Sequence, residues 1–266
     1  MLDGTATRME RVRGTARVTL GPGGLERLYQ AGAAKVMLPR TDRAEPEIVL
    51  LNTAGGLTGG DRLSYDLTLG QSATVATQTA ERAYASTGSL AEVDLSFTVT
   101  DGARLTWLPQ ETILFDRSAL SRRTRIELTG TAEILMCEIV VLGRHAMGEA
   151  VDHLTFADRR EIRRDGRLIH LESLSPSGAP ADWTGPALLQ DARVFASLVM
   201  TGPDLEHRLT ALRPLLDDAS VKAAASAFDG RLALRAMATD LFPLKRLMAR
   251  AITHLTGAPL PRVWQI

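Results

Sequence analysis

The chain has 266 residues, of which 45% are hydrophobic and 23% charged, as in ordinary soluble globular proteins. Its 31 basic residues balance its 31 acidic ones, which argues against sequence-independent nucleic-acid binding. The one cysteine, Cys137, excludes an internal disulfide and a cysteine-rich zinc site, and it favours a reducing compartment. No apolar signal segment opens the chain, and the longest apolar run, 134–142, is interrupted by Glu138. We therefore expect a soluble, cytoplasmic protein that does not enter a membrane.

Alternating apolar and polar residues run through the first two thirds of the chain. Every second residue of 63–69 and of 93–99 is apolar, and the same spacing continues in 105–107 and 126–128. Alternation with a period of two is typical of half-buried strands. The threonine-rich stretch 74–79 also fits a strand, because β-branched side chains are stiff in a helix.

A weak repeat of about 30 residues lies within these predicted strands. In each copy a strand leads through a glycine-containing turn to an alanine and a second strand, and the three alanines are Ala73, Ala103 and Ala132. A unit that recurs at a fixed period is typical of stacked layers, as in a solenoid or β-helix. Ordinary hairpins of a β-sandwich would also produce three degenerate copies.

The pattern changes after about residue 170, where prolines and glycines surround Trp183 and indicate a loop. Leucines recur at helical spacing in 204–216 and in 243–255, and Gly257 is a stop signal for the second of these predicted helices. Between the two, Asp229-Gly230 predicts a hairpin, although its alanine-rich flanks would also tolerate a helix.

The first of three candidate site segments is glycine-rich. Residues 52–61 follow an apolar strand, as a phosphate-binding loop would, but no Lys-Ser/Thr follows the glycines and Asp61 would repel phosphate. A predicted strand follows, so no helix N-terminus is available to bind an anion. We interpret the glycines as allowing two strands to pack closely.

The second segment, 107–116, places Glu111 and Asp116 among large apolar residues, an environment that raises the pKa of a carboxyl group. Two carboxylates, Asp61 or Glu111 together with Asp116, could serve as the acid and base of a β-helical carbohydrate-active enzyme. Twelve aromatic residues in the whole chain are few for a sugar-binding groove. The alternative is a corner at which Pro109 ends a strand and Glu111 pairs with an arginine.

The third segment, 137–149, gathers potential metal ligands, namely Cys137, Glu138, His145, Met147 and Glu149. Their spacing matches no fixed metal site, and a cysteine among apolar residues usually packs in the core. These residues alone therefore identify no catalytic machinery.

The three segments, together with two others, resemble motifs of the UreD (UreH) family of urease accessory proteins. The similarity comes in the family's order and spans nearly the whole chain. It is carried by Gly55-Gly56-x-x-Gly59-Gly60-Asp61, Thr77-Gln78-Thr79-Ala80-Glu81-Arg82-Ala83-Tyr84, the segment from Trp107 to Asp116, Gly143-Arg144 with Gly148-Glu149, and Pro261-Arg262-Val263-Trp264.

The resemblance implies a mainly β (α+β) fold of stacked strands, β-helix-like, with a few helices in the C-terminal third. We expect a single domain over 1–266, β-rich over 1–175 and mixed over 176–266. The terminal Trp264 belongs either to a partner-binding surface or, as we expect, to a tail anchored in the core.

The resemblance also implies a function that is not enzymatic. UreD proteins form a complex with UreF and the GTPase UreG, dock on apo-urease and help to deliver nickel, which is thought to pass through an internal passage. Homodimerisation through that complex is compatible with this role. Nickel(II) would then be in transit, with no permanently bound cofactor, and scattered carboxylates would hold it weakly enough to release it. The candidates for the path are Asp61, Glu111, Asp116, Glu138 and Glu149.

Overall fold

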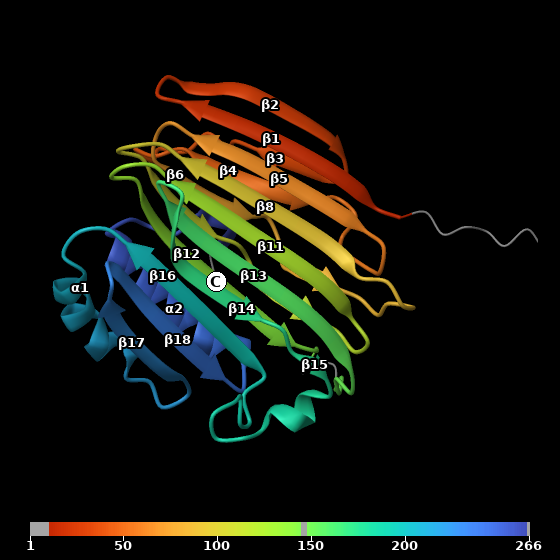
Figure 1. Ribbon diagram of the computed structural model, residues 1–266. Helices are drawn as coiled ribbons and strands as arrows, with labels where there is room; N and C mark the ends of the chain where they lie inside the picture. The colour runs from red at the N-terminus through yellow and green to blue at the C-terminus, as the bar shows by residue number, and fades with distance from the viewer. Residues whose placement is uncertain (1–10, 145–147, 265–266) are drawn as a thin grey trace, which may run out of the picture.

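Two β-sheets stacked face to face form the body of the protein in the computed structural model, which describes residues 11–144 and 148–264 (Figure 1). The sheet that we call sheet A contains β1 (Arg13–Gly21), β2 (Gly24–Gly32), β5 (Arg62–Leu69), β8 (Ala91–Val99), β11 (Ala119–Leu128), β13 (Leu154–Arg164), β14 (Arg167–Leu174) and β15 (Ser177–Gly178). Sheet B contains β3 (Ala34–Met37), β4 (Glu47–Asn52), β6 (Ala73–Thr77), β7 (Glu81–Ala83), β9 (Arg104–Leu108), β10 (Thr112–Leu114), β12 (Glu133–Leu142), β16 (Val194–Thr201), β17 (Lys222–Phe228) and β18 (Arg231–Ala238).

From β5 to β13 the chain passes back and forth between the two sheets. Strands β5, β8, β11 and β13 lie parallel to one another in sheet A, and β6, β9 and β12 lie parallel in sheet B. Antiparallel strands flank this parallel region, at β2 and β14 in sheet A and from β16 to β17 in sheet B. The predicted stack of strands is therefore confirmed, because the chain coils through the two sheets in turn. The repeat does not correspond to the hairpins of a β-sandwich.

The pairing of equivalent strands within each sheet shows how far the 30-residue repeat holds. Leu67 pairs with Phe97 in sheet A, and Leu105 pairs with Ile134 in sheet B, as the repeat predicts. However, Ala73 pairs with Leu105 and lies two residues away from the position of Ala103. The chain from Leu69 to Ala73 is two residues shorter than the chain between their partners Val99 and Leu105, so the alignment of the first copy is wrong beyond that turn.

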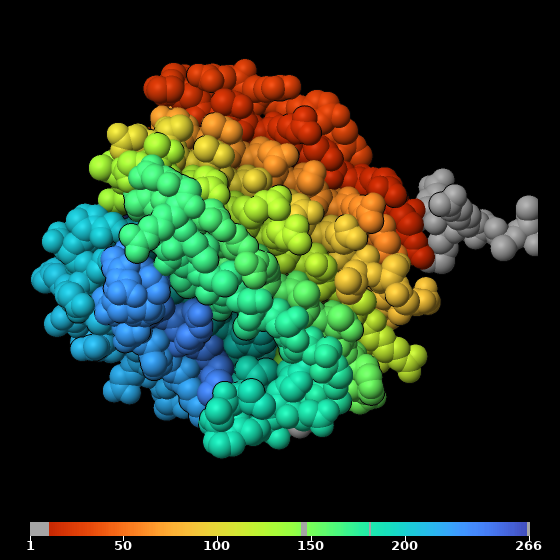
Figure 2. All heavy atoms as spheres, in the orientation of Figure 1, coloured from red at the N-terminus to blue at the C-terminus, as the bar shows by residue number. Residues whose placement is uncertain are grey.

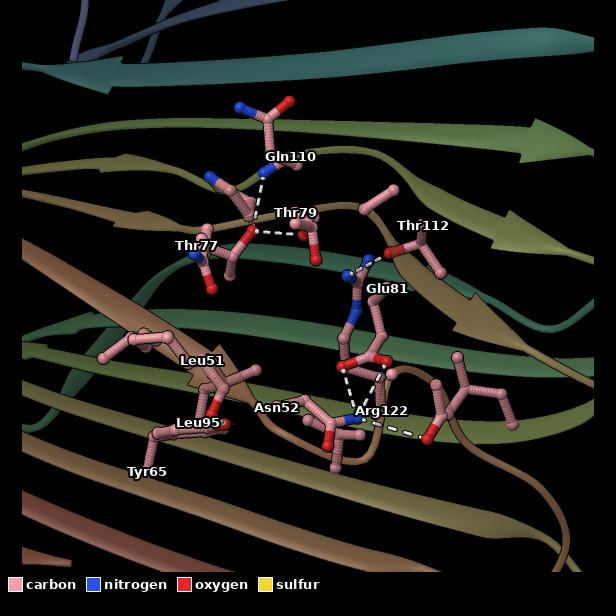
Figure 3. Close-up of a pocket in the computed structure, with 18 of the residues that line it drawn as sticks. Leu51, Asn52, Tyr65, Thr77, Thr79, Glu81, Leu95, Gln110, Thr112 and Arg122 are labelled. Carbon is pink, nitrogen blue, oxygen red and sulfur yellow. Dashed lines mark hydrogen bonds between the residues drawn. The ribbon is translucent and has the colours of Figure 1, made fainter. Parts of the chain in front are cut away.

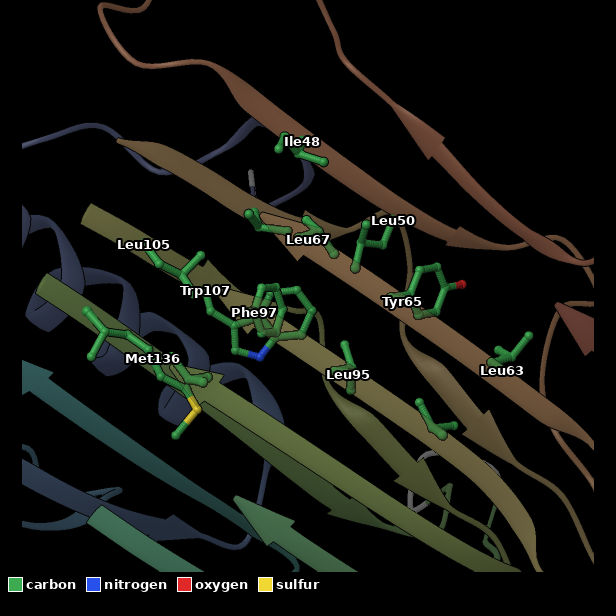
Figure 4. Close-up of a cluster of buried hydrophobic side chains, with 14 of the residues drawn as sticks. Ile48, Leu50, Leu63, Tyr65, Leu67, Leu95, Phe97, Leu105, Trp107 and Met136 are labelled. Atoms are coloured by element: carbon green, nitrogen blue, oxygen red, sulfur yellow. The ribbon is translucent and has the colours of Figure 1, made fainter. Parts of the chain in front are cut away.

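One hydrophobic core fills the space between the sheets. The inward residues of β5 and β8 that alternation predicted are all buried. Figure 4 shows them packed against residues of sheet B, where the rings of Phe97 and Trp107 lie 5.1 Å apart between centroids. This core fixes the distance between the sheets, and any polar group placed within it must find a partner there.

A second core lies between the other face of sheet B and the helices α1 (Leu205–Leu212) and α2 (Leu241–Thr256). Helix α1 ends earlier than predicted and continues as a 3₁₀ turn over 213–216, because Pro214 has no N–H for an α-helical bond. Helix α2 begins at Leu241, two residues before the predicted start and directly after its cap Asp240, and it is stopped by Gly257 as predicted. None of the described helices has the length and apolar character needed to cross a membrane.

The remaining C-terminal predictions concern turns and the tail. Asp229 and Gly230 both have positive φ, 46° and 72°, and join β17 to β18 in the predicted hairpin. The segment around Trp183 contains a short 3₁₀ turn, 180–183. Trp264, in the 3₁₀ turn Arg262–Trp264, is buried and its Nε1 donates to the carbonyl oxygen of Leu108 at 2.8 Å. The tail is therefore anchored in the second core, as expected.

Candidate functional site between the two sheets

A small cavity lies between the sheets, next to the glycine-rich segment (Figure 3). Its volume of about 60 Å³ has room for a few water molecules. Its wall combines apolar residues of the core with polar side chains, and the polar residues are Asn52, Tyr65, Thr77, Gln78, Thr79, Glu81, Gln110, Thr112 and Arg122. A polar, partly charged cavity beside a hydrophobic core marks a candidate site.

Glu81 is the acidic group of this cavity. It begins the short strand β7, and its carboxylate accepts hydrogen bonds of 3.2 and 3.4 Å from the side-chain amide of Asn52. Burial raises the pKa of Glu81 from 4.5 to about 7, although the amide of Asn52 and the nearby Arg122 act in the opposite direction. The side chain therefore exchanges a proton near neutral pH.

Arg122 connects the cavity to a deeper set of charges. It occupies an inward position of β11, where its Nη1 donates to Thr112 Oγ1 at 2.9 Å and lies 3.0 Å from Glu138 Oε2. Its Nε and Nη2 bond both carboxylate oxygens of Asp158, at 3.1 and 2.5 Å. Burial alone would lower the pKa of Arg122, but the carboxylates of Asp158 and Glu138 raise it, so the guanidinium stays charged.

The charges continue through Arg160, the next inward residue of β13 after Asp158. Arg160 bonds Asp158 on one side, and on the other its Nη1 donates to Glu172 at 3.0 Å and to Ser197 at 2.6 Å. Burial alone would raise the pKa of Asp158, but Arg122 and Arg160 lower it to about 2. We call the five residues Arg122, Glu138, Asp158, Arg160 and Glu172 the charge ladder; all are buried and they bridge the two sheets.

The far end of the charge ladder reaches a surface hollow. Glu172 accepts from Arg235, whose Nη2 lies 3.0 Å from Oε1 and whose side chain is half exposed. Both residues line a cavity of about 750 Å³ whose other walls are mostly apolar, including Trp183 and Phe195. Figure 2 shows a hollow in this part of the surface, between the β14 region and the loop around Trp183. A continuous run of charged side chains thus links the polar cavity to this hollow.

Four of the five carboxylates predicted from the sequence lie outside this run. Asp61 accepts from the backbone amides of Val12 and Thr58, both at 2.8 Å, and holds the glycine-rich segment to β1. Glu149 bonds Arg144, with 2.9 Å between Oε2 and the backbone nitrogen. Glu138 is the predicted candidate that belongs to the charge ladder, where it also accepts from Trp107 Nε1 at 2.7 Å. The role of these residues in a nickel path stays a prediction.

Glu111 and Asp116 each bind groups other than one another. Glu111 pairs with Lys245 at 2.9 Å, and not with an arginine as the structural alternative predicted. Asp116 accepts from the backbone amides of His153 and Asp152, and these bonds lower its pKa, whereas its apolar neighbours predicted a rise. The sequence shows the apolar neighbours but not the amides that a distant loop supplies.

The metal-ligand candidates of the third segment also separate. Cys137 faces the second core, where burial raises the pKa of its thiol. His145 and Met147 lie outside the described residues. Within the described ranges, no three His, Cys, Asp or Glu side chains are grouped so that they could hold a metal ion.

Sequence reasoning missed Glu81 and four members of the charge ladder. The signal was present in the alternation itself: Arg122 falls on the inward parity of β11, and Asp158 and Arg160 fall on that of β13. A charge at a core-facing position of a strand needs a buried partner, so several such charges predict a network.

Comparison with known proteins places the chain in a family. The family model described as UreD urease accessory protein matches residues 12–265. The chain is 51% identical to a urease accessory protein UreD of Cereibacter sphaeroides, over 97% of this chain and 96% of the relative. It is 47% identical to a urease accessory protein UreD of Paracoccus denitrificans, over 97% and 94% of the two chains. The chain therefore belongs to the UreD family of urease accessory proteins.

Proposed function

We propose that this protein is a urease maturation factor that works with UreF, the GTPase UreG and apo-urease, and that nickel passes between its two sheets. In this proposal the protein is a cytoplasmic, non-enzymatic scaffold and chaperone, and Ni²⁺ is its cargo rather than a resident cofactor. The observation that carries the proposal is the charge ladder, which runs between the two sheets and joins a small polar cavity to a surface hollow.

The balance of charge along this route favours a cation. Once Glu81 has lost its proton, it and the charge ladder offer four carboxylates, against the three guanidiniums of Arg122, Arg160 and the half-exposed Arg235. Buried carboxylates attract a divalent ion strongly because the local dielectric constant is low. Each ladder carboxylate already has an arginine partner, so an arriving ion must compete with it, which keeps binding weak and reversible.

Glu81 is the carboxylate best placed to receive an ion first. Its hydrogen bonds come from the neutral amide of Asn52, and it borders a cavity with room for water. Because its pKa lies near neutrality, a cation that approaches can replace its proton at little cost. Hydrated Ni²⁺ would thus exchange one water for a carboxylate oxygen and release a proton.

The test is complementation of a strain that lacks this gene, at limiting nickel. We expect wild-type protein to restore urease activity and its nickel content, whereas Glu81→Gln and Glu172→Gln lower both several-fold. Glu92→Gln is the matched control, since the side chain of Glu92 is 45% exposed and pairs with Arg62 at the surface.

Co-purification of the variants with UreF and apo-urease separates transit from assembly. We expect both glutamine variants to remain in the complex, because glutamine has the size and shape of glutamate. Fully metallated urease in cells with either variant would contradict a route through that residue. Fully metallated urease in the deletion strain would refute the maturation role itself.

A further inference from the structure

Strand β2 is an unprotected edge of sheet A. Among the described residues it pairs with β1 on one side and with no strand on the other, and it lies at the outermost margin of the stack in Figure 1. Nearly all its residues are exposed, including Tyr29 at 47% and Leu28 at 39%. Natural proteins usually cover or interrupt such an edge, because its free N–H and C=O groups recruit another strand.

The backbone bonds of β1 identify which groups of β2 are free. The carbonyl of Val12 accepts from β5, and that of Arg13 accepts from the residue that follows β2, so successive residues of β1 point to opposite sides. By the observed register, Tyr29 directs its backbone groups to β1. Leu28 and Gln30 therefore direct their N–H and C=O groups to the free edge.

We propose that this edge pairs antiparallel with β2 of a second copy of the chain, across a two-fold axis at Tyr29. A two-fold axis perpendicular to the sheet keeps each side chain on the same face of the sheet in both copies. Odd-numbered residues can therefore stand opposite only odd-numbered residues, and even-numbered opposite even-numbered. With Tyr29 opposite its counterpart, Leu28 of each copy exchanges both backbone bonds with Gln30 of the other. Arg27 then stands opposite Ala31, and no like charges meet.

Neighbouring registers are less favourable. Shifting the axis to Arg27 places two guanidiniums opposite each other, which is destabilising. Shifting it to Leu28 requires pairing at Glu26, where β2 carries an extra residue relative to β1 and its edge is irregular. The axis at Tyr29 uses the regular part of the strand, from Arg27 to Ala31.

The side chains argue for a second copy rather than an unrelated strand. The two Tyr29 residues would form a non-hydrogen-bonded pair of the antiparallel ladder, in which opposite side chains lie close together. Cross-strand aromatic pairs of this kind are stabilising. Arg17 already lies 5.9 Å from the centre of the Tyr29 ring within one chain. Arg27 of the second copy lies diagonal to the same ring, within reach of a further cation–π contact. The strand is thus complementary to itself in this register, and the inference is independent of the proposed function.

The first test is the molar mass of the full-length chain, by light scattering coupled to size-exclusion chromatography. We expect wild-type protein to show twice the monomer mass and Tyr29→Lys, which puts two ammonium groups at the axis, to show the monomer mass. Phe242→Lys is the matched control, because Phe242 is an exposed aromatic residue of α2. A monomeric wild-type chain, or a dimeric Tyr29→Lys variant, would overturn the proposal.

The second test reads the register by disulfide cross-linking, which is clean because the native Cys137 is buried. Across the axis the two Tyr29 Cα atoms would be about 4.5 Å apart, within the range of a disulfide. Tyr29→Cys should therefore form a covalent dimer on mild oxidation. Arg27→Cys alone should not, since its two copies are about 13 Å apart along the strands, but it should cross-link when mixed with Ala31→Cys. Failure of Tyr29→Cys to cross-link, or self-linking of Arg27→Cys, would overturn the register.

Discussion

Replacing Glu81 by glutamine should stabilise the protein at alkaline pH and leave its stability unchanged at acidic pH. Below pH 4.5 the carboxyl group is protonated in the folded and the unfolded chain, so it adds no pH-dependent difference. Above pH 7 the folded chain must ionise a buried group, which destabilises it. A rise in the pKa from 4.5 to about 7, at about 1.4 kcal/mol per pH unit, corresponds to about 3 kcal/mol.

The assay is urea unfolding of the wild type and Glu81→Gln between pH 4.5 and pH 8. Glutamine keeps an oxygen that accepts from Asn52, so packing and hydrogen bonding change little. We expect the variant to be about 3 kcal/mol more stable at pH 8, with the difference disappearing toward pH 4.5. Glu92→Gln, at the surface, should follow the wild type throughout. Parallel curves for the wild type and Glu81→Gln would refute the argument that burial raises the pKa of Glu81.

Three further changes test the packing around the site. Arg160→Met removes a guanidinium that bonds two buried carboxylates, and it should lower the free energy of unfolding in urea by about 3–5 kcal/mol. The control Arg125→Met breaks an exposed ion pair and should lower it by less than about 1 kcal/mol. Equal losses in the two variants would contradict the argument from burial. Trp264→Ala should cost about 3–5 kcal/mol because the indole is buried, and an unchanged melting temperature would mean that the tail is not anchored. Gly59→Ala should cost about 1–3 kcal/mol, since its Cβ would overlap the carbonyl oxygen of Ser89; a neutral effect on the melting temperature would refute close packing there.

The sequence predicted the fold well wherever one face of a strand or helix is buried and the other is exposed to solvent. Alternation in 63–69 and 93–99 identified strands, and the leucine spacing in 243–255 identified α2, because burial imposes a period on both. The register of the first repeat failed because turn length is set by local geometry, and the two turns differ by two residues. The register in which strands pair cannot be predicted from the repeat period alone.

The site was harder to predict than the fold, for a physical reason. The candidates were chosen because they lie in or beside dense motifs, and Asp61 proved to bond backbone amides of the glycine-rich segment and of the residue before β1. Glu81 lies within one of the motifs that resemble the UreD family, but its raised pKa depends on a core assembled from many strands. Arg122 and Asp158 are 36 residues apart and meet because β11 and β13 are neighbours in sheet A. Such contacts follow from topology, and topology emerged only with the structure.

The two-core arrangement has a consequence for how the chain is made. The outer face of sheet B, with Leu135, Cys137 and Ile139, is covered by α2 and Trp264, which are translated about 100 residues after β12. At a synthesis rate of about 5–20 residues per second, this apolar face stays open for several seconds after β12 has been translated. Truncation before α2 would leave it uncovered permanently. The coil can begin to form early, but the nascent chain is exposed to aggregation until α2 closes over the sheet.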